Sequence, residues 1–128
     1  MTIADQFMVA LTAWRENRGG GYEGMQSVAN VILNRAHKRG TTAYEECIRP
    51  WQFSSITAKA DPELVLYPAL TDPQWKLAMN IAQDAADGKL SDITGGATFY
   101  YALSIPHPPM WAQAMQKTAE IQGQIFFK

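Results

Sequence analysis

The sequence predicts one α+β domain that is mainly helical and has a small extended region near its C-terminal end. With 128 residues, the chain has the usual size of one domain and is too short for two. Three segments carry apolar residues three and four positions apart, which is typical of amphipathic helices. After Gly88 this periodicity gives way to glycines, aromatic residues and prolines. We therefore treat residues 1–128 as a single domain.

The first predicted helix covers residues 3–17. Its apolar stripe has helical spacing and comprises Ile3, Phe7, Leu11 and Trp14. Thr2 followed by Asp5 three residues later is a typical start signal. The helix is expected to end before the three glycines at 19–21, because consecutive glycines carry a high backbone entropy cost and favour a turn. Glu16 therefore lies at the helix end, beside a glycine turn.

The second helix is predicted over residues 23–38 and is expected to be central. Its apolar positions cover more than one face and include Met25, Val28, Ala29, Val31, Ile32, Leu33 and Ala36. Gly40 is expected to end this helix. A short helical turn is predicted over residues 44–48. Aromatic and hydroxyl residues alternate over residues 50–57, which predicts an extended segment.

A third helix is predicted to begin at Pro73. Thr71 and Asp72 supply a cap, and a proline at the first helical position loses no hydrogen bond that the helix needs. Gly88 is expected to end this helix. Its predicted buried stripe comprises Trp75, Met79, Ala82 and Ala86.

The C-terminal region is predicted to hold the extended part of the fold. Residues 91–110 contain two adjacent glycines, three adjacent aromatic residues and three prolines, which favours a loop or strand that displays aromatic side chains. Residues 118–127 fit either a small hairpin or a helix tail. Periodicity does not decide between these two.

Charge and composition argue against several classes of function. Eleven basic and twelve acidic residues give a formal net charge of -1, so the chain lacks the overall attraction to phosphate that favours nucleic-acid binding. It has no run of about 18 apolar residues and no basic leader with an apolar centre, so we expect neither membrane insertion nor a signal peptide. If the target lies outside the membrane, we expect a protein that is made in the cytoplasm and reaches the target after lysis, by delivery in a particle, or after removal of a segment that this sequence lacks.

No metal or cofactor is expected. His37, His107 and Cys47 stand far apart, without the short spacings that pairs of metal ligands usually show. Cys47 is the single cysteine, so it forms no internal disulfide and is predicted to be a small buried hydrophobe. The glycines at 19–21 lack the Lys-Ser/Thr pair of a phosphate-binding loop.

Glu16 is the candidate for acid–base chemistry. It lies at a helix end, ahead of a glycine turn that can admit a substrate closely. A general acid must carry a proton at working pH, which burial favours and nearby guanidinium groups oppose. The catalytic interpretation therefore requires Arg15 and Arg18 to point away and aromatic side chains to shield Glu16. Otherwise Glu16 is a solvated ion-pair partner.

A second carboxylate is used by most glycoside hydrolases, but the sequence selects none. The candidates near loops are Glu23, Glu45, Glu46, Asp61 and Asp92, each of which also suits a surface charge or a helix cap.

Aromatic residues in the loop and strand segments are a further signal, because flat rings stack on sugars. They are Trp51, Phe53, Phe99, Tyr100, Tyr101 and Trp111. Phe99 is predicted to be core. On a strand, alternation would send one of Tyr100 and Tyr101 inward and the other toward a groove.

Several short motifs follow one another along the chain. They are Trp14-Arg15-Glu16-Asn17-Arg18-Gly19, Tyr22-Glu23-Gly24 leading to Asn34-Arg35, Gln52-Phe53-Ser54, residues 94–101 and residues 121–127. Their order and spacing resemble the SleB-like cell wall hydrolases, a group that contains spore-cortex-lytic enzymes. The pattern of that family runs aromatic-Ala-Glu-Ala-Arg-Gly-Glu, then Tyr-Glu-Gly, then a helix ending Val-Leu-Asn-Arg. The resemblance spans nearly the whole chain.

The resemblance implies a lysozyme-like, mainly helical single domain whose small extended region lines a glycan groove. It implies cleavage of the β-1,4 bond between N-acetylmuramic acid and N-acetylglucosamine, by a lytic transglycosylase in which one Glu acts first as acid and then as base. Glu16 matches the catalytic position. The substrate-binding residues expected from the resemblance are Glu23, Gln52, Ser54, Gly95, Gly96, Tyr100 and Tyr101. We expect a monomer that acts on peptidoglycan strands, as an endolysin does.

Two positions depart from the family pattern. The second Glu of the pattern is Gly20 here, so its contribution is lost or supplied by Glu23, and the small residue after the first Glu is Asn17. The departure at Gly20 favours an alternative, a non-catalytic glycan-binding or structural virion domain on the same fold. A third interpretation is a chitinase-like activity on plain N-acetylglucosamine polymers.

Overall fold

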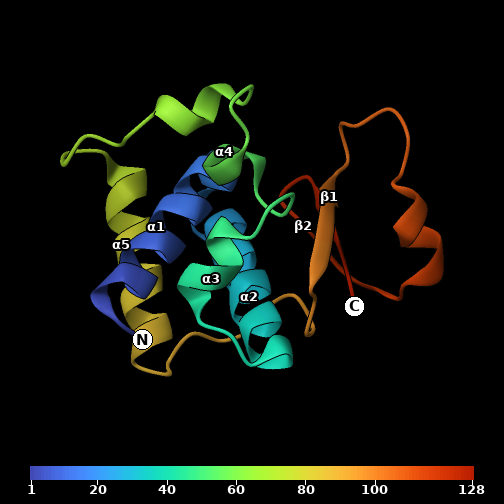
Figure 1. Cartoon of the computed structure of the whole chain (residues 1–128), viewed down its shortest axis with the longest axis horizontal. Coiled ribbons are helices and arrows are strands. Elements are labelled where there is room, and N and C mark those ends of the chain that lie inside the picture. The colour runs from blue at the N-terminus through green and yellow to red at the C-terminus, as the bar shows by residue number, and fades with distance from the viewer.

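The computed structural model describes residues 1–128 and places the helices on one side and a small sheet on the other (Figure 1). The helices are α1 (Ile3–Asn17), α2 (Gly21–Arg39), α3 (Ala43–Ile48), α4 (Ser54–Thr57) and α5 (Pro73–Ala86). The strands are β1 (Phe99–Ala102), β2 (Lys117–Ile121) and β3 (Gln124–Phe127), and three 3₁₀ turns are η1 (Arg18–Gly20), η2 (Pro62–Val65) and η3 (Met110–Ala114). The predicted mainly helical α+β class is confirmed. None of the helices combines the length and apolar character that a membrane span requires.

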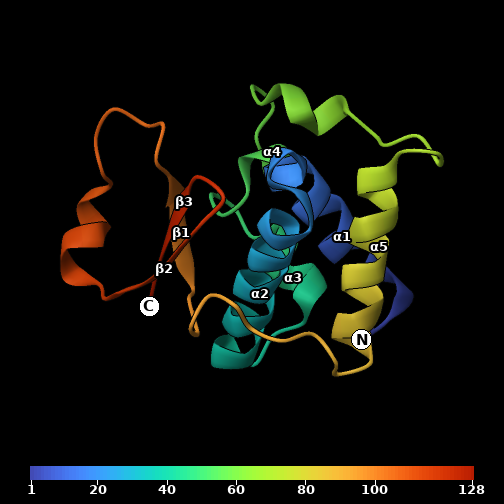
Figure 2. The ribbon, with the colours of Figure 1, turned by 180° about the vertical axis from the view of Figure 1, so that it is seen from behind.

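α1 lies between α2 and α5 and forms the middle of the helical core (Figures 1 and 2). Thr2 and Asp5 form the predicted capping box, in which each side chain accepts from the backbone N–H of the other residue. The buried apolar residues of the helix are Val9, Ala10, Leu11, Ala13 and Trp14. The first half of the predicted stripe is wrong, since Ile3 is 86% exposed and Phe7 47%. The Phe7 and Trp75 rings meet edge to face, with 6.0 Å between their centroids.

α2 is the central helix, as predicted, and is buried on two faces. Met25, Val28, Ala29 and Ile32 belong to the main core of 16 residues. Val31 faces the other way and packs with Ala97 and Phe126 in a small second core beneath the sheet. The helix ends at Gly40, whose φ of 68° is the left-handed conformation that glycine adopts without strain. α2 therefore separates the helical core from the sheet.

The prediction of an extended segment over residues 50–57 is wrong in its second half, because Ser54–Thr57 forms the short helix α4. Phe53 is fully buried, and its carbonyl accepts from the backbone N–H groups of Ile56 and Thr57 and from the Thr57 hydroxyl. The alternation along this segment has no neighbouring strand to pair with. Burial of Phe53 and these local hydrogen bonds therefore decide the conformation.

α5 begins at Pro73, as predicted, with the Asp72 carboxylate accepting from a backbone N–H of the first turn. Its buried residues are Trp75, Ala78, Ile81 and Ala82. The expected burial of Trp75 and Ala82 is confirmed, whereas Met79 is 51% exposed and Ala86 is only partly buried. One helical position is a rotation of about 100°, so a stripe traced through position 79 instead of 78 leaves the packed face.

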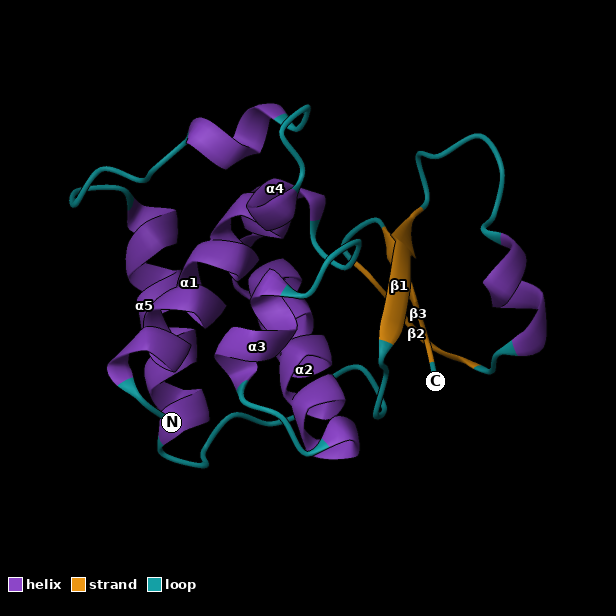
Figure 3. Ribbon diagram, in the orientation of Figure 1, coloured by secondary structure: helices purple, strands orange, loops and turns teal.

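The C-terminal region forms a three-stranded antiparallel sheet in the order β1-β3-β2. Of the two interpretations of residues 118–127, the hairpin is correct, and its turn has positive φ at Gln122 and Gly123. Tyr100 in β1 lies opposite Phe126 in β3. The sheet lies beside α2 on the side away from α5, and the chain between β1 and β2 forms an outer excursion that contains η3 (Figure 3).

Candidate active site

Glu16 lies in the last turn of α1 and is half-buried. Its carboxylate oxygen Oε1 accepts a hydrogen bond of 2.6 Å from the hydroxyl of Tyr100, which lies in β1. The two residues are 84 positions apart, so this contact joins the helical region to the sheet. Among the residues predicted for the site, Tyr100 is the one that hydrogen-bonds to Glu16.

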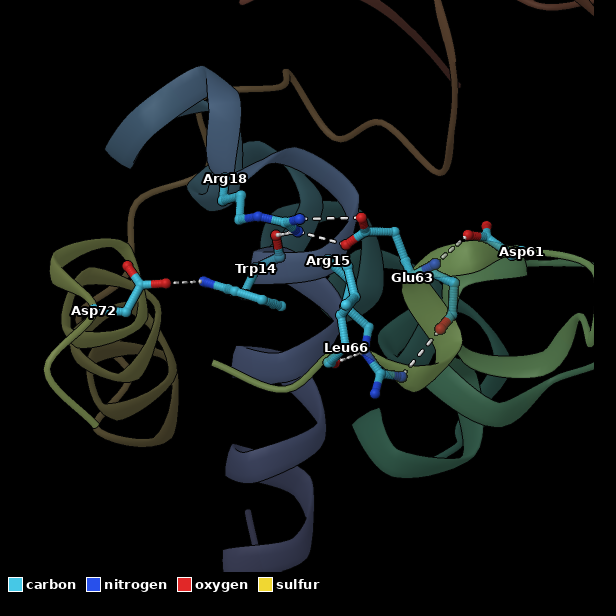
Figure 4. A network of polar contacts seen from close by, with 8 residues as sticks. Trp14, Arg15, Arg18, Asp61, Glu63, Leu66 and Asp72 are labelled. Atoms are coloured by element: carbon cyan, nitrogen blue, oxygen red, sulfur yellow. Dashed lines mark hydrogen bonds and ion pairs between the residues drawn. The ribbon is translucent and has the colours of Figure 1, made fainter. Parts of the chain in front are cut away.

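Arg15 points away from Glu16. Its Nη1 donates to the carbonyl of Ser55 at 3.0 Å and its Nε to the carbonyl of Leu66 at 3.1 Å (Figure 4). The guanidinium also lies over the ring of Tyr67, 4.8 Å from its centroid. Arg15 therefore fastens the segment between α4 and α5 to the end of α1.

Arg18 also points away from Glu16, because it forms a two-pronged ion pair with Glu63 in η2 (Figure 4). Its guanidinium lies over the Trp14 ring, 4.0 Å from the centroid. The Trp14 indole is 5% exposed, and its N–H donates to the Asp72 carboxylate at 3.1 Å. Both arginines are thus engaged with groups other than Glu16, as the catalytic interpretation requires, and the aromatic side chain that hydrogen-bonds to Glu16 is Tyr100.

Strand alternation separates the two tyrosines of β1. Tyr100 lies on the face toward the helices, and its ring packs 5.5 Å from that of Phe126. Tyr101 lies on the opposite face, stacked on Phe127 at 5.6 Å and edge-on to Trp111 at 6.0 Å. The sequence leaves open which of the two tyrosines points inward. In the structure the inward-facing residue is Tyr100.

Tyr100 is held as a neutral phenol. Burial raises the pKa of Tyr100 well above its ordinary value, and the adjacent Glu16 carboxylate raises it further, while Arg35 acts in the opposite direction. A neutral phenol keeps its proton and donates it in a hydrogen bond. Tyr100 can therefore orient one oxygen of Glu16 and leave the other free for a substrate.

Three polar residues of α2 fasten β1 and the loop before it, and the sequence did not assign them a role. Asn34 donates to the carbonyl of Ala97 at 2.9 Å, and Arg35 donates through Nε to the carbonyl of Thr98 at 2.6 Å. Asn30 donates to the carbonyl of Ser91 at 3.0 Å. Asn34-Arg35 belongs to the quoted motif, so a signal was present. The physical signal was the presence of polar residues at positions where a central helix packs against other elements.

The Arg35 side chain is 5% exposed and lies between two aromatic rings. Its guanidinium carbon is 5.1 Å from the ring centroid of Phe53 and 5.3 Å from that of Phe99. Phe99, predicted to be core, is only half-buried. Burial lowers the pKa of Arg35, which nevertheless stays a cation at neutral pH. Arg35 therefore connects the segment before α4 to β1.

Gly95 and Gly96 form the turn that leads into β1, with φ values of 69° and 83°. A Cβ atom at Gly95 would lie 3.2 Å from the Cβ of Thr118 in β2. The N–H of Gly96 donates to the Asp92 carboxylate at 3.0 Å. The conformation and the packing of the turn therefore account for glycine at positions 95 and 96. The predicted contact of Gly95 and Gly96 with glycan stays a prediction.

The other predicted binding residues lie on the surrounding surface. Glu23 is exposed in the first turn of α2, Gln52 is half-buried, and Ser54 is exposed at the start of α4. The Ser54 hydroxyl donates to the Asp61 carboxylate at 2.6 Å. None of the three hydrogen-bonds to Glu16, and their role in binding also stays a prediction.

The candidates for a second carboxylate are engaged elsewhere or stand apart. Glu46 is fully buried and bonded to Arg39, Thr41 and Arg49. Asp92 accepts from Asn34, Thr94 and Gly96. Asp61 accepts from Ser54 and from the N–H of Glu63, while Glu23 and Glu45 are exposed near the ends of helices. The chain also has no group of three or more His, Cys, Asp or Glu arranged to hold a metal ion.

The two departures from the family pattern contact each other. The side-chain oxygen Oδ1 of Asn17 accepts from the backbone N–H of Gly20 at 3.1 Å, and the side-chain nitrogen Nδ2 of Asn17 donates to the Gln124 side chain in β3 at 3.2 Å. A Cβ atom at Gly20 would lie 2.8 Å from the Asn17 oxygen, and one at Gly24 would lie 2.8 Å from its nitrogen. Asn17 therefore fills the space beside Gly20 and adds a link to the sheet.

Comparison with known proteins defines the class to which this site belongs. The cell wall hydrolase family model matches residues 19–127, so the chain belongs to the cell wall hydrolase family. A search of curated proteins returns no match. Glu16 and Arg18 lie just before the matched range, so their place in the site depends on the structure.

Two solved structures resemble the whole chain. One is the catalytic domain of the germination-specific lytic transglycosylase SleB from Bacillus anthracis, with 28% identity, a TM-score of 0.76, and coverage of 100% of this chain and 97% of that one. The other is the catalytic domain of the SleB protein of Bacillus cereus, with 27% identity, a TM-score of 0.78, and coverage of 100% and 92%. The predicted resemblance to SleB and the lysozyme-like class are confirmed.

Proposed function

We propose that this protein is a lytic transglycosylase that cleaves the β-1,4 bond between N-acetylmuramic acid and N-acetylglucosamine in peptidoglycan, with Glu16 as acid and base. The family and the likeness to SleB catalytic domains support the reaction class. The observation that supports the role of Glu16 is its contact with Tyr100, while both neighbouring arginines are bound elsewhere. A half-buried carboxyl group with one oriented oxygen suits proton transfer.

The proposed reaction needs one carboxyl group in two steps. Protonated Glu16 donates its proton to the glycosidic oxygen, the bond from that oxygen to C1 of the muramic residue breaks, and an oxocarbenium-like centre forms. The Glu16 carboxylate then takes the proton of the 6-hydroxyl of the same sugar as O6 attacks C1. The products are an anhydro-muramic end and a free 4-hydroxyl, and no water is consumed.

Tyr100 acts as a positioning group in this proposal. Its hydrogen bond stabilises the carboxylate form that exists between the two proton transfers and fixes its rotamer. We also propose that one copy of the chain suffices, because Glu16 and Tyr100 come from the same chain.

Digestion of purified sacculi tests the proposal, with released fragments identified by mass spectrometry. The wild type is expected to release anhydro-muropeptides. Glu16→Gln is expected to lower the rate by roughly 10² to 10⁴, the usual contribution of a general acid. Tyr100→Phe, which keeps the ring and removes the hydrogen bond, should lower the rate by a smaller factor.

Three results would change the conclusion. Fragments with reducing ends would indicate hydrolysis by water. Equal release by wild type and Glu16→Gln would remove Glu16 from the mechanism. Binding to sacculi without any release would support the alternative of a binding or structural domain, which the Gly20 departure favours.

A further inference from the structure

Trp51 is the most exposed large apolar side chain of the molecule, with 96% of its surface accessible. The other tryptophans are packed: Trp14 and Trp75 are buried, and Trp111 lies against the rings of Phe99 and Phe127. Indole rings bury more apolar surface than most side chains when they find a partner. Nothing within the chain covers Trp51.

The backbone at Trp51 does not favour a tryptophan. The N–H of Gln52 donates to the carbonyl of Arg49 at 3.3 Å, which closes a turn with Pro50 and Trp51 in its middle. Trp51 has a φ of 68°. A turn with proline followed by a residue of positive φ ordinarily takes glycine or asparagine at that second position. Since glycine would form this turn without strain, the fold itself does not account for the indole.

A cavity of about 320 Å³ lies beside the indole, at the small end of the roughly 300–1,000 Å³ range of ligand pockets. We call it the Trp51 pocket, and its lining residues are Ile48, Pro50, Trp51, Ser54, Thr57 and Ala58. Half of this lining is apolar and none of it is charged. The pocket contains neither Glu16 nor Tyr100, so it is separate from the candidate active site.

The two hydroxyl groups of the pocket are set to accept hydrogen bonds. The Ser54 hydroxyl donates its hydrogen to the Asp61 carboxylate at 2.6 Å, and the Thr57 hydroxyl donates to the carbonyl of Phe53 at 3.1 Å. Each oxygen keeps a free lone pair. The pocket therefore suits a neutral ligand with O–H or N–H donors and an apolar face. A carboxylate ligand is disfavoured, because the Ser54 hydroxyl is hydrogen-bonded to the negatively charged Asp61 carboxylate.

The pocket lies on the segment that connects the two sides of the active site. Arg15, the neighbour of Glu16, holds the carbonyl of Ser55 in α4. On the other side, Phe53 shares the Arg35 guanidinium with Phe99 of β1. The segment that carries the pocket is therefore attached both to the end of α1 that carries Glu16 and to the strand that carries Tyr100.

We propose that the Trp51 pocket is a distal glycan subsite that binds an N-acetylated sugar ring. One face of the ring stacks on the indole, the sugar hydroxyls or acetamido N–H donate to Ser54 and Thr57, and the acetamido methyl lies against Ile48 and Ala58. This inference rests on the proposed function, because it takes the glycan strand as the substrate. It adds a site that gives affinity for long strands without touching the bond that is cleaved.

Binding of a hexamer of N-acetylglucosamine by the full chain in a Glu16→Gln background tests the subsite. Trp51→Gly removes the indole and relieves the positive φ, so the variant is expected to fold, which thermal unfolding verifies. It should bind the hexamer about tenfold more weakly, the change that corresponds to about 1.4 kcal/mol. Trp51→Phe should regain most of the affinity. The matched control is Met110→Ala, which changes another highly exposed apolar side chain, 88% accessible and located in η3. This variant should bind the hexamer as the parent does.

A second measurement reads Trp51 directly. Acrylamide quenches the fluorescence of exposed indoles. In the parent, the bound hexamer should reduce the quenching of Trp51. In Trp51→Gly the exposed indole is absent, so the hexamer should not change the quenching. Unchanged affinity of Trp51→Gly, or equal quenching with and without hexamer, would overturn the subsite while fragment release from sacculi still supported the proposed function. Conversely, Trp51-dependent binding with no fragment release by the wild type would support the subsite and contradict the proposed reaction.

Discussion

The helical region and the sheet region of this protein are stabilised in different ways. The helices share one core of 16 buried residues. The sheet has only a small core of three buried residues against α2, and polar side chains of α2 bind the loop that leads into β1. Because Glu16 comes from the first region and Tyr100 from the second, the site depends on how firmly the two are joined. Apolar packing forms the scaffold, and directional polar contacts hold the segment that carries Tyr100 in place relative to Glu16.

The largest effect on the contact between the helical region and the sheet region is expected from Phe126→Ala. Phe126 is fully buried and lies between Tyr100 and Val31, so its removal should cost about 3–5 kcal/mol, as for other buried phenylalanines. Hydrogen exchange should rise mainly in residues 97–127, and release of fragments from sacculi should fall. Phe126→Leu, which keeps a large apolar side chain, should lose much less stability. Uniform loss of protection across α1 and α5 would show that the two regions unfold together.

Arg35→Met tests the polar part of the joint. It keeps the length of the side chain but leaves the carbonyl of Thr98 without its partner, at a cost of about 1–3 kcal/mol. We expect faster exchange around β1 and a lower rate on sacculi, with the far-ultraviolet helical signal retained. Arg35→Lys should recover part of the rate if the donor matters. Identical behaviour of the two variants would assign Arg35 to packing alone.

Acidification should weaken the helical region through Glu46. Burial raises the pKa of Glu46, but hydrogen bonds from Thr41 and Arg49 and the charge of Arg39 outweigh it, and the pKa lies below its ordinary value. The folded-state pKa is lower than the unfolded one, so this stabilisation is present at neutral pH and is lost as pH falls through the folded-state pKa. Glu46→Gln should lower the free energy of unfolding at neutral pH by about 1–3 kcal/mol, and the midpoint of thermal unfolding should fall accordingly.

The same variant should flatten the dependence of that midpoint on pH at acidic pH, below the ordinary pKa of a glutamate. Asp92→Asn is a useful comparison, because the pKa of Asp92 is also lowered but its partners hold the loop before β1. An unchanged slope in Glu46→Gln would show that other carboxylates govern acid unfolding.

The smallest expected effect concerns Asn17 and Gly20. Gly20→Ala should cost about 0.5–1.5 kcal/mol, because the added methyl displaces the Asn17 side chain from its hydrogen bonds. In Asn17→Ala the same methyl has room, so the double variant should be no less stable than Asn17→Ala alone. A double-mutant cycle from denaturant unfolding measures this coupling. Additive effects would mean that the two residues vary independently.

The sequence predicted the helical region better than the sheet. The boundaries of α1 follow from a cap at Thr2 and the glycines after Asn17, which are local signals. The choice between a hairpin and a helix tail at residues 118–127 depends on pairing with β1, so local periodicity could not make it. The helix α4 was missed for a similar reason, since burial of Phe53 against distant residues overrides the local alternation.

For the site, the sequence selected Glu16 and placed Tyr100 among the binding residues, but their contact spans 84 positions and needed the fold. The release of Glu16 from Arg15 and Arg18 was a stated condition, and only the positions of Glu63 and the backbone carbonyls could satisfy it. Arg35 was overlooked because a charged residue near a helix end ordinarily suggests a surface position.

The order of the strands sets the time at which the site can form during synthesis. β1 has β3 as its only strand partner, and β3 ends at Phe127. A growing chain on the ribosome can fold its helices early, because their contacts are complete once α5 has emerged. Tyr100 is not held beside Glu16 until the final strand is made. The contact between Tyr100 and Glu16 is therefore stabilised only after residues 124–127 have been synthesised.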